Sequence, residues 1–239
     1  SSGGITTSII GGDTNTISVG LKNNGILGGR SASITSGNYS ATIGGFNPTN
    51  TGGASVVLAG YSNTNNGGSS SVVGGSYNTN DGGSSSIIGG NQNTIDSGSD
   101  NSVISGGKTN NISNDYSVIS GGTDNTVSGY KSGIIGSENS TVSQNKSFIA
   151  GGADNSVSGF NSSIVGGRNN TVSSDNSGIV GGIENLVTNV DSFIAGGTGN
   201  TVTNIKSSII GGEDNSSGAL NTVILGGKQN TISTGLNNN

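Results

Sequence analysis

Carboxylates are the residues of this chain whose types and spacing could support catalysis. Asp124, Asp154, Glu184 and Asp214 each stand three residues after the first glycine of a repeated Gly-Gly pair. Two carboxylates at a fixed distance can hydrolyse a glycosidic bond by acid–base or nucleophilic catalysis. Here the acids return at one repeat position, and no separate acidic cluster stands apart from the repeat. This pattern indicates a solvated acidic stripe along the turns, and we expect no enzyme.

Other catalytic and ligand-binding patterns are missing from the sequence. There is no His and no Cys, so the common nucleophile–base pairs cannot form. The Gly-Gly-x-Asp-Asn turns lack the Gly-Gly-x-Gly-x-Asp pattern of calcium-binding β-rolls, and no glycine-rich stretch carries the Lys-Ser/Thr of a P-loop. We therefore expect no metal, no cofactor and no catalytic residue.

Charge and composition narrow the class of protein further. The net charge is −5, and the eight basic residues are scattered, which argues against nucleic acid as a partner. No apolar run is long enough to cross a membrane, and no signal peptide is present, so we expect no membrane insertion by this segment and a mature or excised piece of a longer protein. Hydrophobic residues are 28% of the chain, but Ile and Val recur in register, which predicts a thin ordered core.

A pair of glycines sets the period of the chain, returning about every fifteen residues. A fixed short period is typical of a solenoid. Each repeat holds two short β-branched segments, Ser-x-Ile-x and Asn-x-Val-x, each followed by turn residues with glycines at positive φ. We predict an all-β parallel β-solenoid of about fifteen 15-residue coils with two strands per coil, forming one domain over residues 1–239. The pairs include Gly74-Gly75, Gly89-Gly90, Gly106-Gly107, Gly121-Gly122, Gly151-Gly152, Gly166-Gly167, Gly181-Gly182, Gly196-Gly197, Gly211-Gly212 and Gly226-Gly227.

Four repeat positions define the inside of the coil. Ile two residues before the first glycine and Val six residues after it, such as Ile164 and Val172, should form two facing apolar ladders. Asn four residues after the first glycine and Ser four before it, such as Asn170 and Ser162, should bond turn backbone and one another along the stack. Residues 46–86 are a variant, in which Asn65 and Asn80 replace the second apolar residue and predict a thinner or polar coil.

The outer face of the Ser-x-Ile-x segment departs from a solvated pattern. The residues that flank the inner Ile compensate each other in volume, as in Phe148 with Ala150 and Gly178 with Val180. A close-packed face has reason to conserve its volume, whereas a solvated face has none. One chain cannot bury this stripe, so the pattern predicts self-association. The candidate seam residues are Val103, Val118, Ile135, Phe148, Val165, Val180, Phe193, Ile210 and Leu225.

The outer face of the Asn-x-Val-x segment is polar, as expected for a strand with one side in water. Leu186 and Asn111 interrupt it, and we expect the third to fifth repeats to lack it. The residues of this exposed ladder are Thr126, Ser128, Thr141, Ser143, Thr171, Ser173, Thr201 and Thr203.

Two resemblances follow from these residues. Asn161-Ser162-Ser163-Ile164-Val165-Gly166-Gly167 resembles the repeats of trimeric autotransporter adhesin heads and of phage and viral fibre proteins, although the period is longer and no stalk or anchor is present. This resemblance implies a left-handed parallel β-roll that forms a trimer about the seam. Asn125-Thr126-Val127-Ser128-Gly129 is similar to the repeats of ryegrass-type antifreeze β-rolls, which implies an ice-binding Thr/Ser face.

The function expected from these observations is structural. The chain should be an extracellular fibre or adhesin shaft at a cell or virion surface, a homotrimer that attaches passively and multivalently. The alternative is a monomeric ice-binding β-roll. Side chains at the tips of the longer turns could contact a host-surface receptor or glycan. We favour the alternative, that they cover the coil edge or a neighbouring subunit. These residues are Tyr116, Tyr130, Phe160, Val190 and Ile205.

Overall fold

A computed structural model of the chain describes residues 6–233, and these residues form an all-β parallel β-solenoid of about fifteen coils with two strands per coil. No helix occurs within this range. The predicted fold class is confirmed, whereas its left-handedness and trimeric state stay predictions. Two compact units divide the chain after Gly122, and we call them the N-terminal unit and the C-terminal unit. Each is a stack of the same coil, and the single domain over residues 1–239 stays a prediction.

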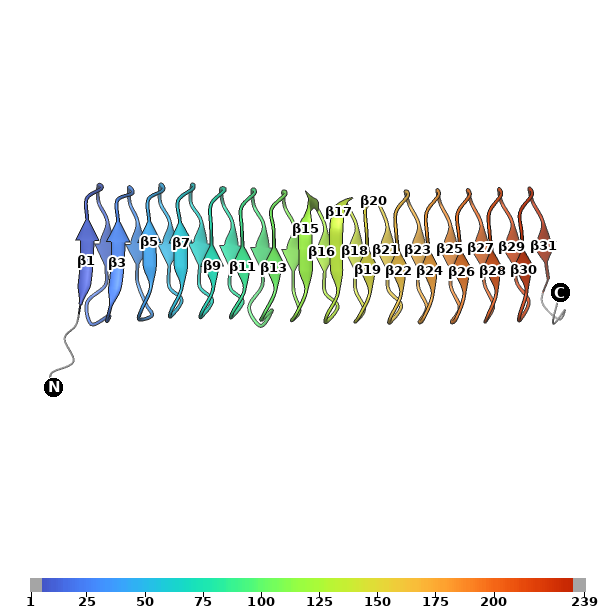
Figure 1. Cartoon of the computed structure of the whole chain (residues 1–239), viewed down its shortest axis with the longest axis horizontal. Helices are drawn as coiled ribbons and strands as arrows, with labels where there is room; N and C mark the ends of the chain where they lie inside the picture. Colours follow the sequence, from blue (N-terminus) through green and yellow to red (C-terminus); the bar gives the residue numbers. More distant parts are fainter. Residues whose placement is uncertain (1–5, 234–239) are drawn as a thin grey trace. The chain divides into compact units, whose positions relative to one another are not determined.

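The N-terminal unit contains two parallel sheets whose strands alternate along the chain (Figure 1). Sheet A holds the Ser-x-Ile-x segments, and sheet B holds the Asn-x-Val-x segments. In sheet A the order is β1 (Thr7–Ile10), β3 (Asn24–Leu27), β5 (Ala41–Ile43), β7 (Val56–Leu58), β9 (Ser71–Val72), β11 (Ser86–Ile87), β13 (Val103–Ile104) and β15 (Val118–Thr123), whose last residue belongs to the C-terminal unit. In sheet B it is β2 (Thr16–Ile17), β4 (Ser33–Ile34), β6 (Thr49–Asn50), β8 (Thr64–Asn65), β10 (Thr79–Asn80), β12 (Thr94–Ile95) and β14 (Asn111–Ile112).

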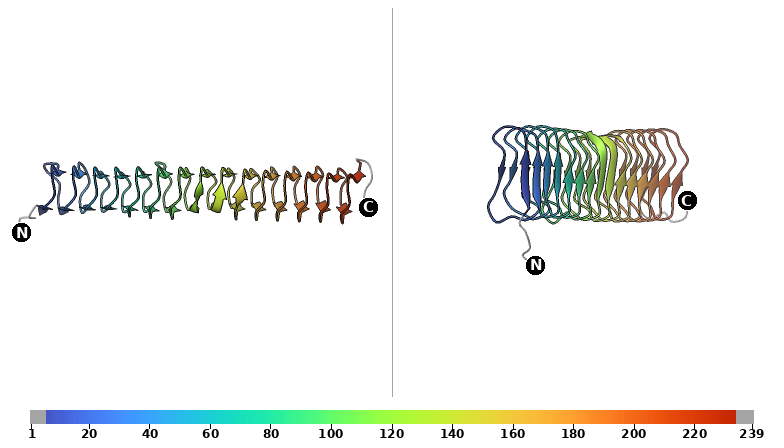
Figure 2. Two further views of the ribbon diagram at one scale, coloured as in Figure 1. Left: turned by 90° about the horizontal axis from the view of Figure 1, so that it is seen from above. Right: turned by 60° about the vertical axis from the view of Figure 1, so that its left-hand side comes forward.

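The C-terminal unit repeats this arrangement, and the views from above and from the side show its strands in two layers (Figure 2). In this unit sheet A holds β17 (Gly133–Glu138), β19 (Phe148–Ile149), β22 (Ser163–Ile164), β24 (Gly178–Ile179), β26 (Phe193–Ile194), β28 (Ser208–Ile209) and β30 (Val223–Ile224), and β20 (Gly152–Ala153) pairs with β17. Sheet B holds β16 (Thr126–Val127), β18 (Thr141–Val142), β21 (Ser156–Val157), β23 (Thr171–Val172), β25 (Leu186–Val187), β27 (Thr201–Val202), β29 (Ser216–Ser217) and β31 (Thr231–Ile232).

The core of each unit lies between the two sheets, as the two aliphatic positions predict. In the C-terminal unit Ile164 of sheet A and Val172 of sheet B are fully buried, and each pairs with the same repeat position of the next coil. The N-terminal unit has the same rows, but Thr42 replaces an Ile of the first row and Asn50, Asn65 and Asn80 enter the second. The predicted polar interior of the variant coils is therefore confirmed.

The second glycine of each pair is required by the close approach of the next coil. Gly167 has a φ of +88°, and a Cβ placed on it would lie 2.2 Å from the Gly182 oxygen and 2.6 Å from Asn170 Nδ2. No side chain fits in that space, and the left-handed φ favours glycine as well. The prediction of positive φ is wrong for several first glycines, including Gly166 and Gly181, which have no left-handed φ.

Asn side chains behind the glycine pair form the predicted ladder from coil to coil. Asn185 Nδ2 donates to Asn170 Oδ1 (3.1 Å), and the Asn185 backbone N–H donates to the same oxygen (3.0 Å). Asn185 Nδ2 also lies 3.1 Å from the Gly181 oxygen and 3.0 Å from the Gly197 oxygen. Each buried amide therefore satisfies turn carbonyls of its own coil and of the next one, and glycine leaves room for it.

One coil of the C-terminal unit has serines instead of the second glycine and the ladder Asn at this turn. Ser137 stands where the second glycine is expected, and Ser140 stands where the ladder Asn is expected. The Ser137 and Ser140 hydroxyls lie 2.6 Å apart, and the Ser140 backbone N–H still donates to Asn125 Oδ1 (3.0 Å). Ser137 has no left-handed φ, and β17 runs through it to Glu138. The shorter Ser140 side chain leaves the volume that the Ser137 Cβ occupies.

Candidate interaction surfaces

The acidic residues that first suggested catalysis are corner residues of the coil. Asp124, Asp154, Glu184 and Asp214 are exposed, and each has a φ between 55° and 58°. Asp and Asn tolerate this left-handed conformation better than most residues, which gives a structural reason for acids at this position. No group of three or more His, Cys, Asp or Glu residues that could hold a metal ion occurs within residues 6–233.

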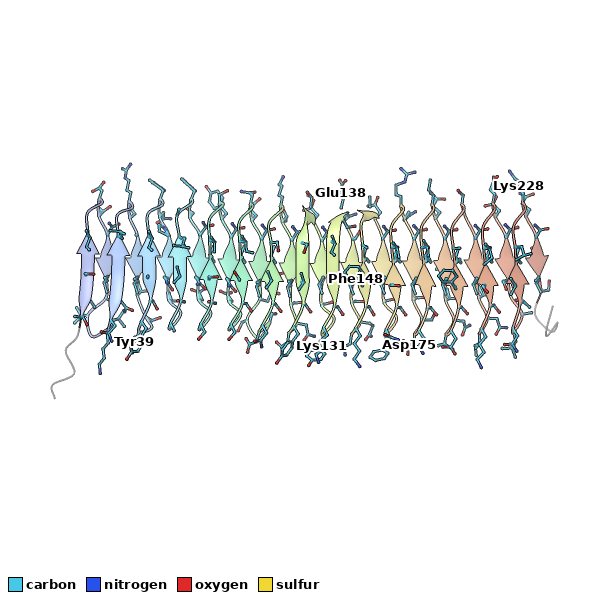
Figure 3. All side chains as sticks on the ribbon, viewed as in Figure 1. Tyr39, Lys131, Glu138, Phe148, Asp175 and Lys228 are labelled. Carbon is cyan, nitrogen blue, oxygen red and sulfur yellow. The ribbon has the colours of Figure 1, made fainter. Side chains whose placement is uncertain are left out.

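The outer face of sheet A in the C-terminal unit carries most of the predicted seam residues. Ile135, Val165, Val180 and Ile210 stand one residue after the inner Ile and are 46–51% exposed. Phe148 and Phe193 stand one residue before it and are 36% and 39% exposed, and Figure 3 shows Phe148 over the strands rather than at a turn. Leu225 is 80% exposed in the same row. We call this set the apolar stripe.

Two predicted seam residues lie in the N-terminal unit, on the same face of its sheet A. Val118 is 39% exposed, and Val103 is half-buried. The other outer row of this face, one residue after the inner position, holds exposed Leu27, Ile43 and Ile88 in that unit. The apolar face therefore occurs in both units, and each unit has an exception to the volume compensation, Val56 with Leu58 and Val223 with Leu225.

A recess interrupts the apolar stripe between the two phenylalanines. Ser163 and Gly178 form part of its lining with Phe193 beside them, and its volume is about 460 Å³. One rim is polar, because Asn176 Nδ2 donates to Asp191 Oδ1 (3.3 Å). A Cβ on Gly178 would meet only ordinary contacts at 3.5 Å or more, so nothing within this chain requires glycine there.

The first glycines of several pairs lie next to this stripe in the sequence and have an unexplained geometry. Gly166, Gly181, Gly196 and Gly211 have no left-handed φ, and a Cβ on any of them would have no heavy atom within 4 Å. In these four coils neither backbone strain nor packing within the chain therefore explains the glycine, whereas the left-handed φ of Gly121 (83°) and Gly151 (123°) favours glycine at the same position of two other coils. The repeat pattern does not reveal this distinction, because both glycines recur together and both are typical of turns.

The Thr/Ser ladder lies on the outer face of sheet B, as predicted. Thr126 pairs with Thr141 across β16 and β18, and Leu186 interrupts the row between Thr171 and Thr201. Thr141, Ser143, Ser173 and Thr203 are exposed, whereas Thr126, Ser128, Thr171 and Thr201 are half-buried.

The expectation that the third to fifth repeats lack this ladder is wrong for its first row. In the N-terminal unit Thr49, Thr64, Thr79 and Thr94 pair in register on β6, β8, β10 and β12. The second row is mixed there, since Thr51 Oγ1 donates to Asn66 Oδ1 (2.6 Å) and Asn66 Nδ2 donates to Asp81 Oδ1 (2.6 Å).

The longer turns place aromatic side chains beside lysines in the C-terminal unit. Lys131 Nζ lies 5.1 Å from the centroid of Tyr130, and Lys146 Nζ lies 5.2 Å from that of Phe160. Lys131 and Asp175 lie at this edge in Figure 3, opposite Glu138 and Lys228. Phe160 is 38% exposed and Tyr130 is half-buried, so lysine stems cover part of their rings.

An aromatic cluster in the N-terminal unit was not predicted from the sequence. It lies on the glycine-pair edge, by which we mean the residues two and three after the first glycine. Phe46 and Tyr61 stack with centroids 4.9 Å apart, Tyr77 meets Tyr61 edge-on at 5.2 Å, and Arg30 lies 5.4 Å from the Phe46 centroid. The signal was the presence of aromatic residues at this edge in three successive repeats.

No protein-family model matches the sequence, and no curated protein matches it significantly. Within residues 6–233 the chain has no helix of the length and apolar character needed to cross a membrane.

Proposed function

We propose that the chain is a structural extracellular fibre or adhesin shaft that works as a homotrimer at a cell or virion surface. The observation that carries this proposal is the apolar stripe bordered by first glycines with open Cβ positions. A second backbone that approached this face would require glycine there, and it would cover side chains that are now 36–80% exposed. A second copy of the chain is the simplest partner because it supplies the same surface without another protein.

The resemblance to trimeric adhesin heads and fibre repeats supports an assembly of three copies. The volume compensation supports a closely packed contact, because a large residue before the inner Ile occurs with a small one after it, as in Phe193 with Ala195. The backbone ladders and the Asn ladder would make such an assembly stiff and resistant to proteases. A receptor or glycan of the host surface would then be bound multivalently.

Solution mass measured by light scattering at low concentration tests this proposal. We expect a mass of about three times 23.1 kDa for the chain. Phe193→Asp places a charge in the seam and should reduce the mass to that of a monomer. Thr201→Asp, on the outer face of sheet B, is the matched control and should leave the trimer intact. A monomeric wild-type chain would rule out the trimeric fibre.

One observation favours ice binding as a second function. Thr49, Thr64, Thr79 and Thr94 form an in-register row on one face of the N-terminal unit. Thermal hysteresis of a monomeric chain would support this function, and Thr64→Tyr should abolish it by disturbing the row. Ser71→Tyr, on the opposite sheet, is the control that should retain it. A chain without thermal hysteresis would exclude ice binding.

A further inference from the structure

Tyr61 and Tyr77 lie close together on the surface of successive coils of the N-terminal unit. Their ring centroids are 5.2 Å apart at an interplanar angle of 61°, and the side chains are 44% and 52% exposed. The backbone fixes this juxtaposition. The Tyr77 backbone N–H donates to the Tyr61 carbonyl oxygen (2.9 Å), and the Tyr61 backbone N–H donates to the Gly75 carbonyl oxygen (2.9 Å). Both rings are thus held side by side and remain open to solvent.

The composition directs oxidation toward tyrosine. The chain has no Cys, Met, Trp or His, so the side chains that usually consume oxidants first are missing, and five tyrosines remain. Hydrogen bonding with the Tyr61 side chain raises the pKa of the Tyr77 phenol above its usual value, so this phenol is protonated at neutral pH. The starting species at Tyr77 is therefore a neutral phenol.

We propose that Tyr61 and Tyr77 are a modification site at which a peroxidase with hydrogen peroxide forms a dityrosine cross-link between two successive coils. Each phenol loses one electron and one proton, and the two radicals join through their ortho ring carbons. The ortho hydrogens then move to oxygen and restore both phenols. Hydrogen peroxide takes up the two electrons and two protons and leaves as two molecules of water. This inference does not depend on the proposed fibre function.

The cross-link would join coils whose interior is polar. Asn65 and Asn80 occupy the second apolar row in the coils that carry Tyr61 and Tyr77, so these coils lack part of the aliphatic contact found elsewhere. A covalent bond at the glycine-pair edge would hold these two coils together and should raise the temperature at which they separate. The cross-linked chain should therefore have a higher melting temperature than the untreated one.

The test treats the dilute, full-length chain with a haem peroxidase and limiting hydrogen peroxide. Trypsin releases one peptide, residues 31–108, that contains Tyr39, Tyr61 and Tyr77, because no Lys or Arg lies between Arg30 and Lys108. We expect dityrosine fluorescence and a loss of two hydrogen atoms within this single peptide. Tyr77→Phe keeps the ring contact but should abolish both signals. Tyr39→Phe removes another exposed tyrosine of the same peptide and should leave both signals unchanged.

Three outcomes would overturn the proposal. One is equal dityrosine fluorescence from the Tyr77→Phe and wild-type chains when circular dichroism shows that both are folded. Another is a cross-link found only between two peptides. The second peptide would then be the one that contains Tyr116 and Tyr130, or one from a second copy of the chain. The third is addition of oxygen to the tyrosines without loss of hydrogen.

Discussion

The variant coils of residues 46–86 and the regular coils of the C-terminal unit have the same backbone but opposite interiors. Val157 and Val172 fill the second inner row of the regular coils, whereas Asn50, Asn65 and Asn80 fill it in the variant coils, and all are fully buried. The parallel register is the same in both, with Thr64 opposite Thr79 and Ser156 opposite Thr171. The coil is therefore set by its backbone ladder and its turns more than by aliphatic side chains.

The variant interior is stable because its amides are satisfied. Asn65 Nδ2 donates to the Val56 oxygen and the Ser70 oxygen (both 3.1 Å), and the Ser70 hydroxyl donates to Asn65 Oδ1 (2.6 Å). Asn50 is held in the same way by Ser55. Buried amides with all partners made cost little, whereas one without partners costs several kilocalories per mole. The comparison teaches that polar and apolar interiors are interchangeable only together with their partners.

Substitution of the second glycine should be the most damaging change and should be equally severe in both regions. A Cβ on Gly75 would lie 2.1 Å from the Gly90 oxygen, and one on Gly167 would lie 2.2 Å from the Gly182 oxygen. We expect Gly75→Ala and Gly167→Ala each to destabilise the fold by about 3–5 kcal/mol. Thermal unfolding followed by circular dichroism measures this.

The neighbouring first glycine provides the control for that prediction. Gly166→Ala has open space and no left-handed φ, so it should not lower the stability of a single chain. The double variant Gly152→Ser with Asn155→Ser removes the contact with Asn155 Nδ2 (2.7 Å) but not the one with the Gly167 oxygen (2.0 Å), so it should recover only a small part of the stability that Gly152→Ser alone loses. If the Gly167→Ala and wild-type chains had the same melting temperature, the close approach of successive coils would not be the reason for the second glycine.

Exchange of the two interiors should have the next largest effect. Val157→Asn places an amide in a row without positioned acceptors and should cost about 2–4 kcal/mol. Asn65→Val leaves the Ser70 hydroxyl without its amide acceptor and two carbonyls without their donor, and should cost about 1–3 kcal/mol. Urea unfolding of both variants gives the values. A stabilised Asn65→Val chain would show instead that the variant coils are limited by their missing aliphatic contact.

Much of this architecture could be predicted from the repeat, and the exceptions have physical causes. Periodicity located the inner Ile and Val, the Asn ladder and the outward Thr/Ser row, because each depends on one position that recurs. Periodicity hid the different reasons for the two glycines, which depend on φ and on the distance to the next coil. It also hid the contact of Phe46, Tyr61 and Tyr77, which belongs to three coils and not to the repeat.

Removal of the aromatic cluster should have a moderate effect that is confined to the variant coils. Tyr61→Ala removes contacts with both Phe46 and Tyr77 and should cost about 1 kcal/mol. Tyr77 itself has a φ of 57°, an unfavourable conformation for this residue, which these contacts help to maintain. Thr198→Ala, at the same edge position of the C-terminal unit, should be neutral. Equal melting temperatures for Tyr61→Ala and wild type would make the cluster irrelevant to stability.

The smallest effect should come from charge pairs on the glycine-pair edge, where the two units again differ. Arg30 contacts both Asp13 (3.5 Å) and the Phe46 ring, whereas Lys228 contacts Glu213 (2.7 Å) without a neighbouring ring contact of this kind among residues 6–233. Hydrogen bonding with Glu213 raises the pKa of Lys228. A raised amine pKa favours the folded state at pH values below the unfolded-state pKa, and this contribution disappears as pH rises through the folded-state pKa. The stability of the wild-type chain should therefore fall slightly above about pH 10.5 relative to that of Glu213→Gln. An NMR titration of the Lys228 side chain in both chains measures the shift, and an unchanged pKa in Glu213→Gln would show that the ion pair does not form in solution.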